Sequence, residues 1–296
     1  MKLALGTVQF GLRYGVANTS GRPAETEVAK VLRRAAGVGV EVLDTACLYG
    51  DSEVVLGRCL PAGHGFRIVT KTPKFAGIDG ASAATALKTS FAESCERLRL
   101  PCLYGLLAHD ANDLVGTTGD AIWRAMKALQ AEQRVMRIGA SVYNGGQIDA
   151  LLQRYPIDLV QLPLSVLDQR LIQSGHLDRL AERNIEVHVR SAFLQGALLM
   201  SPDLLPPHLA GLRPSLEQVS ARAAGLGISP LQAALRFVSG LKQVAAVVCG
   251  VDSLAQFDQL AAALEHHPEV ALSLEDAAAC ACNDIQLLDP SQWRSA

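Results

Sequence analysis

Short apolar runs alternate with amphipathic segments along the whole chain. Most of the runs are apolar at consecutive positions, which is typical of parallel strands that helices cover on the outer face. The runs rich in Val, Ile, Leu and Ala predict eight strands at 2–6, 41–44, 66–70, 103–108, 137–140, 159–162, 186–189 and 244–249.

The segments between the strands have a helical period. At 26–38 the apolar residues recur every three to four positions, which predicts a helix with one buried face. Ser229 and Ser253 are each followed by Gln three residues later, a pattern that favours capping boxes. The same period predicts further helices at 82–99, 120–133, 146–154 and 171–183, and a last one near 274–285.

Eight strand–helix units in 296 residues, with no Gly/Ser linker between them, indicate the fold class. They predict α/β architecture as one (β/α)8 TIM barrel, a single domain over residues 1–296. A doubly wound open sheet is the alternative. No G-x-G-x-x-G sequence follows the first strand, which argues against that alternative.

Composition excludes several classes of partner. A net charge of −2 gives no basic surface for nucleic acid and no polybasic membrane signal. No apolar run reaches the roughly 18 residues that span a bilayer, and the N-terminus is expected to be a first strand in a cytoplasmic protein. The seven cysteines are expected to be reduced, and no metal site is predicted, since Cys280 and Cys282 would point to different faces of a helix.

Ionisable side chains follow three successive predicted strands. The second strand ends on Asp44 with Tyr49 in the next loop, the third is followed by Lys71 and the fourth by His109. In a barrel the carboxyl ends of the strands carry the chemistry. Each residue alone has an ordinary structural explanation, as a loop cap, a surface lysine or a core histidine. Their occurrence together points to a reactive site.

These residue types suit the protonation of an oxygen. A tyrosine has a pKa near 10, and a neighbouring lysine ammonium is expected to lower it by stabilising the phenolate. An aspartate beside the lysine would keep the ammonium charged, and a neutral histidine could hold a carbonyl oxygen in place. A hydride delivered to the carbon would have to come from a cofactor.

The sequence around these residues resembles the aldo-keto reductase family. The similarity rests on the sequence LDTACLYGDSE at 43–53, followed by Lys71 and His109 at strand ends. The family folds as a (β/α)8 barrel and reduces aldehydes and ketones with a nicotinamide cofactor, usually NADPH. The resemblance implies that Tyr49 donates the proton, that Lys71 and Asp44 tune it, and that His109 orients the carbonyl.

The resemblance also implies a set of cofactor contacts. Ser141 and Gln161 match positions that hold the nicotinamide carboxamide, and the sequence SAFLQG at 191–196 is a variant of the pyrophosphate segment. The cofactor-binding residues implied are Gly6, Thr7, Asp44, Ser141, Gln161, Arg190, Ser191, Phe193, Leu194, Gly196, Gly250, Val251, Ser253 and Gln256.

Two positions depart from the family pattern. Arg190 stands where many members stack an aromatic ring on the nicotinamide, and it could stack there or bind a phosphate or a substrate carboxylate. The segment 250–257 contains no Lys or Arg for an adenosine 2′-phosphate, and Asp252 is acidic. The expected cofactor is NADPH, with NADH as the alternative.

The substrate is expected to be a small carbonyl compound in a pocket lined by Val8, Phe10, Tyr14 and Leu48. The loop at 9–18 either covers the site or forms a plain turn, and Arg13 or Arg190 would suit an anionic substrate. Two other functions remain open at this stage. Lys71 could form a Schiff base in an aldolase-type barrel, or the barrel could bind NADPH without turnover as a sensor or partner subunit.

Overall fold

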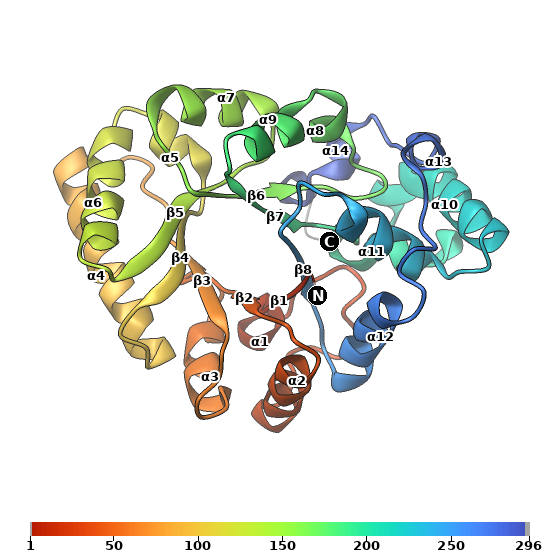
Figure 1. The fold of residues 1–296 in the computed structure, drawn as a ribbon, viewed down its shortest axis with the longest axis horizontal. Helices are drawn as coiled ribbons and strands as arrows, with labels where there is room; N and C mark the ends of the chain where they lie inside the picture. The colour runs from red at the N-terminus through yellow and green to blue at the C-terminus, as the bar shows by residue number, and fades with distance from the viewer. Residues whose placement is uncertain (1, 294–296) are drawn as a thin grey trace.

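The strands of this computed structural model, which describes residues 2–293, close into one parallel barrel in the order of the sequence (Figure 1). Each strand pairs with the next, and β8 pairs with β1 through Leu3 and Val247 to close the ring. The barrel confirms the predicted fold class. The strands are β1 Leu3–Gly6, β2 Val42–Asp44, β3 Arg67–Lys71, β4 Leu103–Ala108, β5 Val135–Ser141, β6 Leu159–Pro163, β7 Glu186–Arg190 and β8 Ala246–Gly250.

Helices surround the barrel and cover the outer face of the sheet (Figure 1). The α-helices are α1 Val8–Gly11, α2 Glu25–Gly37, α3 Ser52–Cys59, α4 Gly80–Leu98, α5 Ala111–Val115, α6 Gly119–Ala131, α7 Gly145–Arg154, α8 Arg170–Gln173, α9 His176–Glu182, α10 Arg213–Gly225, α11 Pro230–Gly240, α12 Leu254–Glu265, α13 Leu274–Ala278 and α14 Ile285–Leu288. The 3-10 helices are η1 Leu194–Leu199, η2 Pro202–Leu204, η3 Pro207–Leu212 and η4 Pro290–Gln292.

Apolar side chains pack in two separate layers. A large cluster joins the outer face of the strands to the helices, and Val28 and Val31 of α2 belong to it with exposures of 0% and 1%. A small cluster consists of strand residues alone, so it fills the inside of the barrel. Its buried members are Ala4, Val42, Val69, Leu107, Leu159 and Ala246.

Two of the predicted helices are broken in the structure. The segment predicted at 171–183 forms α8 and α9, because Gly175 adopts φ = 71° and ends the helical path between them. The last predicted helix is likewise divided into α13 and α14. Both predictions of one continuous helix were wrong. The spacing of apolar residues is the same on both sides of the turn, so the spacing alone does not show where a helix is interrupted.

The two predicted caps differ in outcome. Ser229 and Gln232 form the complete capping box at the start of α11. Ser253 accepts the N–H of Gln256 at the start of α12, but the Gln256 side chain accepts the N–H of Asp252 instead. Within residues 2–293, none of the helices combines the length and the apolar character that crossing a bilayer requires.

Candidate active site

Three of the predicted ionisable side chains meet at the carboxyl end of the barrel. Asp44 ends β2 and Lys71 ends the neighbouring strand β3, so the two lie side by side. The Lys71 Nζ donates to both carboxylate oxygens of Asp44 at 2.7 Å, to the Thr45 carbonyl at 3.0 Å and to the Tyr49 Oη at 3.3 Å. Lys71 is 2% exposed, so water does not screen this ion pair.

The loop that carries Tyr49 is held in place by hydrogen bonds among the hydroxyl groups of Thr7, Thr45 and Ser52. The Ser52 Oγ donates to the Thr7 carbonyl at 2.8 Å and also contacts the hydroxyls of Thr7 and Thr45. Gly11 lies directly beneath this loop, where an added Cβ would be 1.8 Å from the Tyr49 carbonyl oxygen. Only glycine allows α1 and the Tyr49 loop to approach this closely.

Burial and charge act in opposite directions on the Lys71–Tyr49 pair. Burial disfavours the Lys71 ammonium, but the Asp44 charge and Tyr49 together outweigh it and raise the Lys71 pKa. Burial of the Tyr49 phenol raises its pKa above the usual 10, and the Lys71 charge does not compensate. Lys71 acts on the Tyr49 pKa in the expected direction, but burial has the larger effect, so the Tyr49 pKa is raised and not lowered. Both groups are protonated at neutral pH.

His109 follows β4 and faces Tyr49. The ring centroids of Tyr49 and His109 are 5.7 Å apart, and the two rings are arranged edge to face. The backbone N–H of His109 donates to the Thr72 hydroxyl at 3.2 Å. Burial, followed by the Lys71 charge, lowers the His109 pKa to about 4, so the imidazole is neutral at pH 7. Its buried Nδ1 has no hydrogen-bond partner among the described residues.

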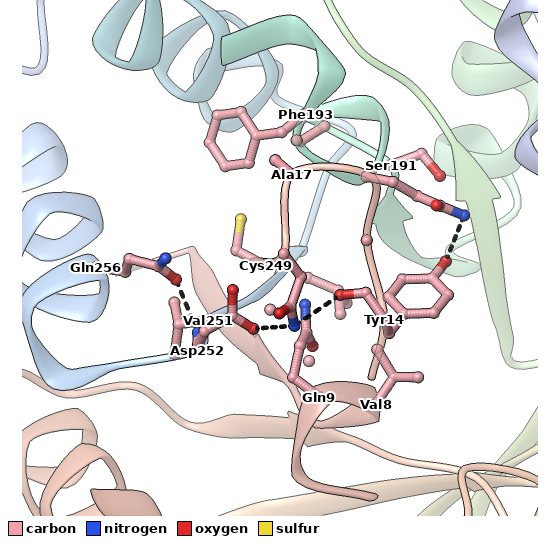
Figure 2. A pocket seen from close by; sticks show the side chains of 18 of the residues that line it. Val8, Gln9, Tyr14, Ala17, Ser191, Phe193, Cys249, Val251, Asp252 and Gln256 are labelled. Atoms are coloured by element: carbon pink, nitrogen blue, oxygen red, sulfur yellow. Dashed lines mark hydrogen bonds between the residues drawn. The ribbon is translucent and has the colours of Figure 1, made fainter. Parts of the chain in front are cut away.

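A cavity of about 390 Å³ opens beside Tyr49 and extends toward the end of β8 (Figure 2). Most of the predicted site residues line it. They are Gly6, Thr7, Val8, Tyr14, Asp44, Tyr49, Gln161, Arg190, Ser191, Phe193, Gly196, Gly250, Val251 and Gln256. The structure thus brings together residues from both ends of the sequence around one space.

Seven predicted site residues do not line the cavity. Two of them, Lys71 and His109, lie next to Tyr49, which does line it, and the other five lie elsewhere. Phe10 and Leu194 are each 1% exposed because their side chains pack in the outer apolar core, so neither side chain lines the cavity. Leu48 is 45% exposed on the rim, and Ser141 is 4% exposed at the end of β5. The Ser253 hydroxyl is used as the cap of α12 and does not line the cavity.

The segment 13–21 crosses the cavity and links the loops that follow β7 and β8; we call it the strap (Figure 2). On one side the Gln195 side chain donates to the Tyr14 hydroxyl at 3.1 Å. On the other, the Asn18 side chain donates to Asp252 at 3.0 Å and to the Tyr14 carbonyl at 3.2 Å. The start of the loop noted in the sequence belongs to the short helix α1, and Tyr14, Gly15, Ala17 and Asn18 line the cavity.

The loop after β7 has an unusual backbone. Ser191, Leu194 and Gln195 have positive φ values of 63°, 46° and 54°, and Gly196 has 94°. Such conformations are costly for residues other than glycine and cluster at ligand sites. Ala192 and Phe193 line the cavity, and their backbone N–H groups have no acceptor within residues 2–293. Free N–H groups of this kind can hold anionic oxygens.

Arg190, the last residue of β7, is held firmly in place. Its guanidinium carbon lies 4.2 Å from the centroid of the Tyr143 ring. Its Nη2 donates to the Val142 carbonyl at 3.1 Å, and its Nη1 donates to the Ser191 hydroxyl at 3.3 Å. No carboxylate in the described part of the chain pairs with Arg190.

The sequence analysis did not identify several residues of the cavity. Gln9 lines it with a buried carbonyl oxygen that has no partner in residues 2–293, and Gly250 leaves room for that side chain. Gln195 and Asn18 were also missed, although the latter lies in the loop that was noted. No local pattern distinguishes them, because their partners are far away along the chain.

A second polar cluster lies at the opposite, amino end of the barrel. Glu186 accepts hydrogen bonds from the Tyr104 hydroxyl at 2.5 Å and bonds to the His188 Nε2 at 2.8 Å. His188 is fully buried inside the barrel. In residues 2–293 no group of three or more His, Cys, Asp or Glu side chains is arranged to hold a metal ion.

The comparisons with known proteins agree with this geometry. The model of the aldo/keto reductase family matches residues 2–280. Among solved structures, an aldo-keto reductase from Bacillus halodurans in its holo form has a TM-score of 0.69 at 20% identity, over 97% of this chain and 92% of that one. A glycerol dehydrogenase from Gluconobacter oxydans has a TM-score of 0.69 at 19% identity, over 94% and 90%. No curated protein matches the sequence.

Proposed function

Since the chain belongs to the aldo/keto reductase family, we propose that it transfers a hydride from NADPH or NADH to an aldehyde or ketone, with Tyr49 as the proton donor. The contact of the Tyr49 hydroxyl with the buried Lys71 ammonium, at 3.3 Å, carries this proposal. The contact provides an acid at the edge of a cavity and a charge that stabilises the anion left behind.

Each residue of the group has a distinct part. The Tyr49 hydroxyl, protonated at neutral pH, gives its proton to the carbonyl oxygen as the carbon is reduced. The Lys71 ammonium then faces the phenolate, and its own charge is secured by both oxygens of Asp44. The neutral His109 imidazole can donate one N–H to the same carbonyl oxygen and orient it. The cofactor supplies the hydride, which no side chain can deliver.

The residues present fit a dinucleotide cofactor. The free N–H groups of Ala192 and Phe193, in a strained loop, are suited to pyrophosphate oxygens. The unpartnered oxygen of Gln9 is an acceptor for a polar ligand group inside the cavity. The strap contacts the loops on both sides and would enclose such a ligand.

The environment of Lys71 argues against a Schiff-base aldolase. A Schiff base requires a neutral amine as the nucleophile. The Lys71 amine is held as an ammonium by a carboxylate at 2.7 Å, and its pKa is raised against the effect of burial. The same contacts suit an electrostatic partner of Tyr49.

The proposal is tested with purified protein, NADPH and a panel of simple aldehydes. We expect aldehyde-dependent oxidation of NADPH, and its loss in Tyr49→Phe by at least about a thousandfold. A fluorescence titration should show that the variant still binds NADPH, which excludes misfolding. Turnover by Tyr49→Phe at the native rate would refute the role of Tyr49. Cofactor binding without turnover of any aldehyde would favour the non-catalytic sensor.

A further inference from the structure

The charges around the reactive end of the cavity do not balance. Among the described residues that line this end of the cavity, Asp44 is the one carboxylate, and Lys71 neutralises it through a short ion pair. Arg190 adds a second cation that lines the same cavity and has no carboxylate partner among the described residues. Among the ionised residues Asp44, Lys71 and Arg190, one positive charge therefore remains in excess near Tyr49.

The excess charge reaches the groups that surround the reaction. Burial is the largest influence on Tyr14, Tyr49 and His109, and it raises the pKa of the two tyrosines and lowers the pKa of the histidine. The Arg190 charge opposes burial at the two tyrosines and acts in the same direction as burial at His109. Asp252 lies at the β8 end of the cavity, where it accepts a hydrogen bond from the Asn18 side chain. Burial raises the pKa of its carboxyl group, and the Gln256 side chain acts in the opposite direction.

Arg190 cannot move its charge away from the cavity without losing its contacts. The Tyr143 ring covers one face of the guanidinium, and the Val142 carbonyl and Ser191 hydroxyl hold two of its nitrogens. Arg190 lines the cavity in this arrangement. A fixed charge costs no reorganisation when the charge of a ligand changes.

From this imbalance we infer that Arg190 makes the site bind the reduced cofactor more tightly than the oxidised one. The inference rests on the proposed nicotinamide chemistry. The nicotinamide ring is neutral when reduced and carries one positive charge when oxidised. A site with a surplus cation therefore destabilises the oxidised ring relative to the reduced ring, so the reduced cofactor is bound in preference and the oxidised cofactor is released more readily.

The inference is tested by measuring dissociation constants of all four cofactor forms, NADPH, NADP⁺, NADH and NAD⁺, by fluorescence quenching or calorimetry. For the native protein we expect each oxidised form to bind about tenfold more weakly than its reduced partner. A tenfold ratio corresponds to a shift of about 30 mV in the reduction potential of the bound two-electron couple. Equal affinity for the two forms would overturn the inference.

Two variants identify the charge as the cause. Arg190→Gln should reduce the ratio of oxidised to reduced dissociation constants about tenfold in both cofactor pairs, while Arg190→Lys should keep it. A loss of affinity shared by all four forms would mean that Arg190 contacts a phosphate, and would overturn the inference. If no cofactor form binds the native protein, the proposed function itself fails, and this outcome is distinguishable from the others.

Discussion

The Gln161 side-chain amide donates a hydrogen bond to the Asp44 Oδ1 over 2.7 Å, from β6 to β2 across the inside of the barrel. The resemblance to known reductases implied a contact between Gln161 and the nicotinamide carboxamide. The structure shows the Gln161 amide engaged with the carboxylate that holds Lys71, and the same residue lines the cavity. Gln161 therefore fixes the orientation of Asp44 in addition to any contact with a ligand.

Removal of this hydrogen bond should weaken catalysis more than folding. In Gln161→Met, Asp44 keeps both contacts to Lys71, so no buried charge is left unpaired. We expect kcat/KM to fall by roughly tenfold, the value of one hydrogen bond to a charged group. The comparison of kcat/KM with the thermal unfolding midpoint checks this. A native kcat/KM in the variant would show that Lys71 alone is sufficient to position Asp44.

His109 should make the folded protein sensitive to mild acid. Burial, together with the nearby Lys71 charge, lowers its pKa from 6.5 to about 4. Between these two values the unfolded chain binds a proton that the folded chain does not. The free energy of unfolding therefore increases as pH rises through this window and decreases as pH falls toward 4. His109→Gln should have a smaller slope of unfolding free energy against pH, measured by urea denaturation at pH 4.5, 5.5 and 7. Parallel curves for the two proteins would contradict the prediction.

Asp252 should disfavour a cofactor that carries a 2′-phosphate. Its carboxylate lines the β8 end of the cavity, where no lysine or arginine of the described chain lines the wall. We expect Asp252→Asn to improve NADPH affinity relative to NADH by about tenfold at pH 8, because a repulsion between two anions is removed. The asparagine oxygen can still accept the hydrogen bond from Asn18, so the strap is preserved. An equal change for both cofactors would mean that Asp252 does not sense the phosphate.

Asn18 should control how fast the cofactor leaves. Its side chain donates to Asp252, to the Tyr14 carbonyl and to the Gly21 carbonyl, and its oxygen accepts the Gly21 N–H at 2.7 Å. Asn18→Ala removes all of these bonds, and we expect the dissociation rate of NADPH in stopped-flow experiments to rise roughly fivefold or more. Tyr14→Phe, which removes only the bond to Gln195, is the matched control and should have a smaller effect. Unchanged dissociation in both variants would exclude the strap as a barrier.

Gly11 should be intolerant of a single methyl group. An added Cβ would lie 1.8 Å from the Tyr49 carbonyl and 2.4 Å from the Ser52 nitrogen, both backbone atoms. We expect Gly11→Ala to lower the free energy of unfolding by about 1–3 kcal/mol or more. Gly37→Ala in α2, where nothing lies within 4 Å, is the control and should stabilise by about 0.5–1 kcal/mol. Urea denaturation compares the two, and a similar stability would argue against the close approach.

The barrel and the Asp44–Lys71–Tyr49 group were predictable for the same physical reason. Apolar runs mark strands, neighbouring parallel strands place their carboxyl ends side by side, and the ionisable residues follow those ends directly. The sign of the Tyr49 pKa shift was not predictable, since it depends on whether burial or the Lys71 charge has the larger effect. Sequence identifies both influences but gives the size of neither.

Other features have no local signal. Phe10 lies in α1, a helix of four residues that is too short to have a period, so its burial in the core could not be anticipated. Asn18 and Asp252 are 234 residues apart in the sequence and touch in space. The sequence shows that Arg190 departs from the family pattern, but it does not show the stacking on Tyr143. That contact joins the end of β7 to the loop after β5, and β6 lies between these two strands in the barrel.

The apolar filling inside the barrel is only a narrow band between two polar zones. Above it lie Lys71, Asp44 and Gln161, and below it lie His188 and Glu186. Most of the hydrophobic stabilisation must then come from the outer layer, where the helices meet the sheet. The free energy of unfolding thus depends mainly on the outer layer between helices and sheet, whereas the proposed chemistry depends on polar residues inside the barrel. Inner substitutions that leave no buried charge unpaired, such as Gln161→Met, can alter the reaction at little cost in stability, and repacking of the outer layer can change stability while the chemistry is preserved.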